Sequence, residues 1–140
     1  GQDFAAHQVA IRRRMNVAAA FTSLSGVLTV RENLKVYGHI YGVRNLDAKI
    51  NELLERFEIT DLAQRKLQVL SSGQHTRVTL CKGLINEPEL LLLDECTLGL
   101  DPDIAEKTRR ALKEFQREQQ TTIVFTSHNM NEVERMRRSA

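Results

Sequence analysis

The strongest constraint on the fold is the segment Leu90–Asp101, in which four consecutive leucines run directly into two acids, Asp94 and Glu95. An unbroken leucine run is typical of a short strand buried on both faces, as in a parallel sheet covered by helices. Ligands of open α/β sheets bind at the carboxyl ends of the strands. Two adjacent acids at that end therefore indicate a metal ion and a base that activates water.

Two other segments carry polar residues next to apolar ones. The sequence Leu70-Ser71-Ser72-Gly73-Gln74 stands where a helix is predicted to begin, so its backbone N–H groups and the helix dipole favour an anion. An ordinary N-cap explains these serines equally well. The apolar segment Thr122–Thr126 predicts a second strand, and His128 follows it closely.

These three elements, in this order and spacing, resemble the nucleotide-binding subunit of an ATP-binding-cassette (ABC) ATPase. The segment Leu70–Gln74 resembles the family's signature sequence, and Leu90–Glu95 resembles its Walker B strand. Leu98–Asp101 is similar to the D-loop, and His128 to the switch histidine. The resemblance extends less specifically from Arg12 to Met136, and the last ten residues of that stretch look most like subunits of multidrug-type exporters.

The resemblance implies that the chain acts on ATP and Mg²⁺. Asp94 would hold Mg²⁺, and Glu95 would polarise the water that attacks the γ-phosphate. His128 would contact that phosphate and help to position the water.

The signature would act on a second subunit. In the resembled family two nucleotide-binding subunits pair head to tail, and each signature caps the γ-phosphate that the other subunit holds. Ser71 would donate its hydroxyl, Gly73 would give a close backbone contact, and Ser72 and Gln74 complete the site. Asp101 would lie in the contact between the two subunits. This predicts a homo- or heterodimer of nucleotide-binding subunits.

The sequence departs from the family pattern at several positions. It contains no Gly-x-x-x-x-Gly-Lys-Ser/Thr loop, whose N–H groups and lysine hold phosphates. Ser72 replaces a glycine, Cys96 replaces a proline, and Ala20 stands where the Q-loop glutamine is expected. We expect these residues to be the later part of a nucleotide-binding domain that, alone, binds Mg-ATP weakly or not at all. The alternative is a non-enzymatic, truncated remnant that folds and self-associates without nucleotide.

The expected fold is α/β, a partial three-layer parallel sheet like that of P-loop NTPases with a small helical subdomain. Residues of about 28–88 would form that subdomain, and residues 1–27 and 89–140 the catalytic core. The resemblance implies that the strands Thr122–Thr126, Leu90–Asp94 and Asn16–Phe21 lie side by side in that order. The first would then be an exposed edge, which predicts an oligomer, a two-fold dimer, with the edge covered by a second copy or by a rearranged local segment. Helices are expected over residues 5–14, from Val30 to Tyr41, from Leu46 to Phe57, from the signature to Pro88, and after Pro102.

Composition excludes several other classes of protein. The net charge is +2 with 27% charged residues, which gives no basic surface for nucleic acid. No apolar run has the length of a membrane span. Cys81 and Cys96 have no zinc-site spacing and indicate buried thiols. The chain is therefore expected in the cytoplasm. The resemblance implies that it is attached to the inner (plasma) membrane through a membrane-spanning transporter subunit that contacts the helical subdomain.

Overall fold

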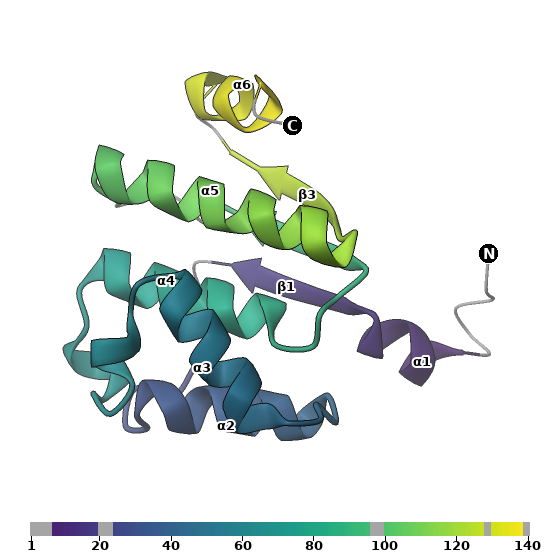
Figure 1. The fold of residues 1–140 in the computed structure, drawn as a ribbon, viewed down its shortest axis with the longest axis vertical. Helices are drawn as coiled ribbons and strands as arrows, with labels where there is room; N and C mark the ends of the chain where they lie inside the picture. Colours follow the sequence, from purple (N-terminus) through teal and green to yellow (C-terminus); the bar gives the residue numbers. More distant parts are fainter. Residues whose placement is uncertain (1–6, 20–23, 96–99, 128–129, 139–140) are drawn as a thin grey trace.

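The computed structural model describes residues 7–19, 24–95, 100–127 and 130–138. It consists of a three-stranded parallel sheet and six α-helices within those ranges (Figure 1). The strands are β1 (Met15–Ala19), β2 (Leu90–Asp94) and β3 (Thr122–Thr126), in the spatial order β1-β2-β3. The predicted strand order and the α/β class are confirmed. Residues 20 and 21, which we expected to continue the first strand, lie outside the described ranges.

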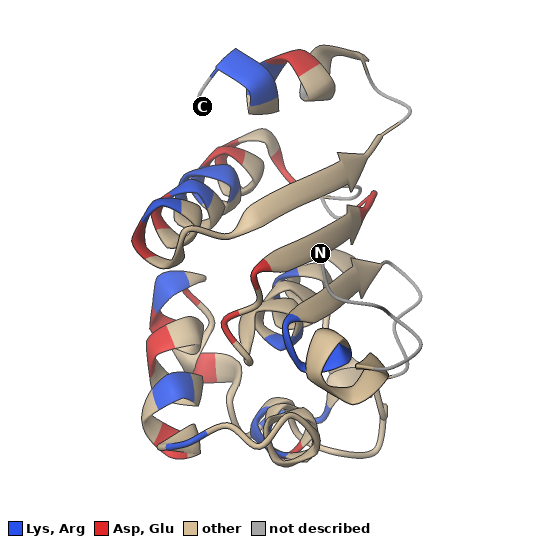
Figure 2. Cartoon of the chain, turned by 90° about the vertical axis from the view of Figure 1, so that its right-hand side faces the viewer, with Lys and Arg blue, Asp and Glu red and all other residues tan. Residues whose placement is uncertain are grey.

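The sheet pairs residue by residue, so that the strand ends coincide. Ala19 lies opposite Asp94, and Asp94 lies opposite Thr126. All three strands point the same way in Figure 2, and Asp94 is the last residue of the central strand. Because parallel strands end at the same edge, the carboxyl end of β2 lies between the ends of its two neighbours.

Six α-helices surround this sheet within the described residues. They are α1 (Gln8–Arg13), α2 (Val30–Ile40), α3 (Leu46–Arg56), α4 (Ser72–Leu84), α5 (Pro102–Gln119) and α6 (Met130–Arg138), with short 3₁₀ turns at Thr60–Leu62 and Leu67–Val69. Of these, α4 packs on the face of the sheet that contains Ala18 and Leu91. In Figure 1, α5 lies between α6 above and the group of α2, α3 and α4 below.

Burial alternates along the strands. Leu91 and Leu93 are buried beneath the helices, whereas Val17 and Val124, on the other face, are 44% and 50% exposed. The leucine run predicted burial on both faces, but Leu90 and Leu92 are only half-buried. The reason is that α4 and α5 both pack on the Leu91 side.

Residue patterns explain the helices. Thr29 caps α2 through a capping box with Glu32. In α5, Pro102 occupies the first turn, as predicted, and Phe115 is fully buried. Near its start, Ala105 is buried and the adjacent Ile104 is half-buried.

The end of α4 packs tightly on the sheet. A Cβ atom built at Gly83 would lie 3.0 Å from the Cβ of Ala18 and 3.2 Å from Cδ1 of Leu91. A larger residue at this position would require its neighbours to move by a few tenths of an ångström, so glycine favours this close approach of the helix to the strands. None of the helices in the described ranges is long and apolar enough to cross a bilayer.

Candidate functional site

The acidic end of β2 is organised by the neighbouring strand. The Thr126 hydroxyl of β3 donates to Oδ1 of Asp94 over 2.6 Å, and the Asp94 side chain is exposed. A hydroxyl donor orients one carboxylate oxygen and leaves lone pairs on the other for a cation. Thr126 was not among the residues predicted to form the site. The pairing register of the two strands could have identified it, because Thr126 ends the strand next to the one that ends in Asp94.

Glu95 leaves the sheet in an unusual backbone conformation. Its φ is +49°, in the left-handed region that non-glycine residues seldom adopt. Its N–H donates to the carbonyl oxygen of Thr126 over 3.1 Å, which holds the turn in place. Such conformations cost about 1–3 kcal/mol and cluster at functional sites. The backbone therefore turns at Glu95, directly after the end of β2.

Both predicted meanings of the signature serines are compatible with the start of α4. Ser71 is the N-cap; its Oγ accepts the N–H of Gln74 over 3.2 Å, and Oε1 of Gln74 accepts the Ser71 N–H over 3.0 Å. The cap uses only a lone pair of the Ser71 oxygen, so its O–H proton remains a donor.

Backbone groups add to this helix start. The N–H groups of Ser72 and Gly73 belong to the first turn, where no helical carbonyl can accept them. Ser71 and Ser72 are exposed, and Gly73 is half-exposed. With the positive end of the helix dipole, this arrangement can bind an anion.

Asp101 is the N-cap residue of α5. Its carbonyl accepts the N–H of Ala105 over 2.8 Å, but its side chain makes no capping hydrogen bond and is exposed. An aspartate at this position would normally cap the helix.

His128, Cys96, Ala20 and the first two residues of the predicted D-loop Leu98–Asp101 lie outside the described ranges. Their predicted roles stay predictions. Cys81 is buried as expected, and burial raises the pKa of its thiol. No cluster of three metal-binding side chains occurs in the ranges that the structure describes. Mg²⁺ does not need such a cluster, since it is usually held by one or two carboxylates, water and substrate phosphates.

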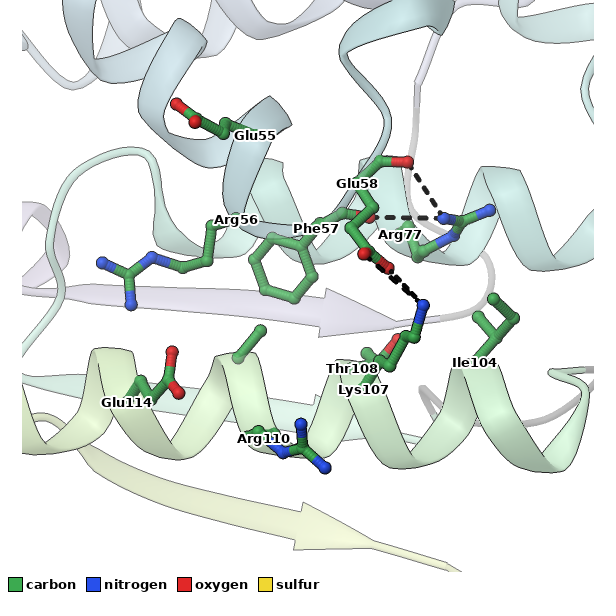
Figure 3. A pocket seen from close by; sticks show the side chains of 11 residues that line it. Glu55, Arg56, Phe57, Glu58, Arg77, Ile104, Lys107, Thr108, Arg110 and Glu114 are labelled. Atoms are coloured by element: carbon green, nitrogen blue, oxygen red, sulfur yellow. Dashed lines mark hydrogen bonds and ion pairs between the residues drawn. The ribbon is translucent and has the colours of Figure 1, made fainter.

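A separate polar cavity of about 290 Å³ lies where α3, α4 and α5 meet (Figure 3). Nη1 of Arg77 donates to the carbonyls of Phe57 and Glu58, both over 3.3 Å, and so caps the end of α3. The Glu58 carboxylate forms an ion pair with Lys107 over 3.3 Å. None of the predicted site residues lines this cavity. Its contacts tie the signature helix to α5.

The chain is similar in sequence to a family of known proteins. The family model described as ABC transporter matches residues 1–98. The chain is 39% identical over 133 residues to Nod factor export ATP-binding protein I of Bradyrhizobium diazoefficiens, covering 91% of this chain and 42% of that protein. It is 33% identical over 137 residues to the ABC transporter ATP-binding protein NatA of Bacillus subtilis, covering 96% and 55%. The chain thus spans about half the length of these relatives.

A solved structure agrees with the sequence matches. A dimeric ATP-binding cassette in a post-hydrolysis state, bound to ADP and Pi, superposes with a TM-score of 0.75 at 28% identity. The match covers 93% of this chain and 59% of that one. An ATP-binding subunit of an ABC transporter, at 23% identity and a TM-score of 0.80, shows the same fold.

Proposed function

Because this chain belongs to the ABC transporter family of ATP-binding subunits, we propose that it supplies the signature, Walker B, D-loop and switch-histidine residues for the ATP binding and hydrolysis that power transport. The observation that carries the proposal is the acidic end of β2, where Asp94 is oriented by Thr126 and Glu95 turns out of the sheet. The transported substrate is outside this proposal.

The residues at this edge fit Mg²⁺ and a water-activating base. Asp94 offers a hard, oriented carboxylate oxygen at an exposed strand end, which is the kind of ligand that Mg²⁺ takes. When bound, the ion would neutralise charge on the phosphate oxygens of ATP. Glu95, at the backbone turn directly after β2, would accept a proton from the attacking water. His128 would help to hold that water.

The start of α4 would bind the nucleotide of a second subunit. Ser71 would donate its hydroxyl proton to a phosphate oxygen while keeping its cap, and the N–H groups of Ser72 and Gly73 would donate beside it. The Gln74 side chain, which caps the Ser71 N–H, would hold this geometry. Asp101, whose side chain does not cap α5, would contact the partner subunit. The dimeric state of the solved cassette bound to ADP and Pi supports this arrangement.

The helical layer would connect the subunit to a membrane-spanning partner. Residues of about 28–88 would form this subdomain, with residues 1–27 and 89–140 in the core. Val36 and Ile40 project from the outer side of α2 and are 46% and 64% exposed, which leaves apolar surface for a protein contact. The subunit would work at the cytoplasmic side of the membrane. This partner and location are supported by relatives named as export and transporter ATP-binding proteins.

The test is a chimera of Nod factor export ATP-binding protein I in which the matching segment is replaced by these 140 residues. The unmodified chimera should hydrolyse ATP. Glu95→Gln should lower its turnover roughly 10²–10⁴-fold, the usual contribution of a general base, and leave Mg-ATP binding intact. Glu89→Gln is the matched control, because Glu89 is an exposed acid at the opposite end of β2 and pairs with Arg14. Normal hydrolysis by the Glu95→Gln chimera would refute the assignment.

A further inference from the structure

A lysine lies buried between the signature helix and the first strand. Lys82 of α4 is 6% exposed, yet it forms no ion pair with any acid in the ranges that the structure describes. Its Nζ donates to Oδ1 of Asn16 over 3.0 Å and to the carbonyl of Val17 over 2.9 Å. The ammonium group also lies 4.9 Å from the centre of the Tyr37 ring of α2. One cation thus joins α2, α4 and β1.

Lys82 belongs to a hydrogen-bond network with Asn16, Asn86 and Tyr41. Nδ2 of Asn16 donates back to the Lys82 carbonyl over 3.1 Å and to Oδ1 of Asn86 over 2.9 Å. The Tyr41 hydroxyl donates to Oδ1 of Asn16 over 3.3 Å, and Nδ2 of Asn86 donates to the Met15 carbonyl over 3.3 Å. Asn16 is 3% exposed. Every bond of this network that reaches the sheet ends on β1.

Burying the charged Lys82 side chain costs more free energy than burying an apolar one. Burial lowers the pKa of the Lys82 ammonium, because a charge loses its hydration inside the protein. An apolar side chain of similar length would pack there at lower cost. Unlike an apolar contact, however, directional bonds fix how far a helix can slide along a strand.

The network connects the helix that begins at the signature to the strand that pairs with β2. Lys82 and Ser71 are on the same helix, and Val17 is two residues before Ala19, which lies opposite Asp94. We propose that Lys82 is a positioning residue, which sets the signature helix in register with the strand beside the acidic end of β2. This inference rests on the function proposed above.

Hydrogen exchange on the chain tests the local link. Lys82→Met keeps the length of the side chain but leaves Oδ1 of Asn16 and the Val17 carbonyl without this donor. Amides of residues 15–19 should then exchange roughly tenfold faster, as expected for a lost buried hydrogen bond, while residues 122–126 keep their protection. Lys82→Arg, which keeps a charged donor, should restore most of the protection.

Cys81→Ala is the matched control. Cys81 is the buried neighbour of Lys82, but its Sγ donates to the Leu53 carbonyl of α3 over 3.6 Å and not to β1. This variant should change β1 and β3 exchange by the same factor. If Lys82→Met does not fold, Asn16→Ala removes the same network from the strand side and should expose β1 in the same way.

Kinetics of the chimera test the consequence. Lys82→Met should lower kcat roughly tenfold and change the KM for Mg-ATP less than about twofold, with recovery in Lys82→Arg. Unchanged β1 exchange, equal acceleration in β1 and β3, or faster β1 exchange with unchanged kcat would each overturn the proposal. These results differ from failure of the proposed function, in which Glu95→Gln would leave hydrolysis normal.

Discussion

The two adjacent serines at the start of α4 allow the capping role of the signature to be separated from its anion-binding role. Ser71→Ala removes the oxygen that accepts the Gln74 N–H, and loss of such a cap typically costs about 1 kcal/mol. Ser72→Ala is the matched control, since Ser72 is exposed at the first helical position and alanine favours the helix. Its effect should stay within about 0.5 kcal/mol.

The expected shift in melting temperature follows from the size of the chain. Unfolding entropy is about 2.1 cal/mol/K per residue, or about 0.3 kcal/mol/K for 140 residues. A loss of about 1 kcal/mol therefore lowers Tm by about 3 °C. Urea denaturation should show the same loss with an unchanged m-value. A Tm for Ser71→Ala equal to that of the wild type, or a Ser72→Ala variant that is equally destabilised, would refute the capping argument.

Ser71→Asp separates the two roles. Aspartate caps a helix about as well as serine, so Tm should stay within about 2 °C of the wild type. Its negative charge would repel a phosphate at the same helix start, and the chimera should lose at least about tenfold in ATP turnover. A Ser71→Asp chimera that hydrolyses ATP normally would show that this helix start only caps α4 and binds no phosphate.

Two further predictions concern the core. Phe115→Ala should lower the free energy of unfolding, measured in urea, by about 3–5 kcal/mol, because its ring is fully buried. Val124→Ala should lower it by less than about 0.5 kcal/mol, because Val124 is 50% exposed. Similar losses for the two variants would contradict the assigned core. Burial raises the pKa of the Cys81 thiol, so above its ordinary pKa of 9.0 the unfolded chain releases a proton that the folded chain keeps. The free energy of unfolding should therefore fall as pH rises above about 9. A Cys81→Ala variant with the same pH dependence would contradict this.

The local elements of this protein could be read from its sequence because their signals are local. Four leucines before two acids specified β2 and its polar end, Ser71 followed three residues later by Gln74 specified the capped start of α4, and Pro102 specified the start of α5. The parallel order of the strands came from the resemblance to a known family, and the sheet has that order.

Other features depend on which segments meet in space, and only the tertiary structure decided them. The hydrogen bond from Thr126 to Asp94 joins residues from two strands and depends on their register, and the left-handed turn at Glu95 is held by the carbonyl of that same threonine. The network of Lys82 and Asn16 joins residues 66 positions apart. Lys82 follows Val78 by one helical turn, so the helical period placed it on the inward face of α4, but that period does not say what lies opposite. A helical or strand period specifies which face is buried, whereas the partner of a buried polar group depends on how the elements pack.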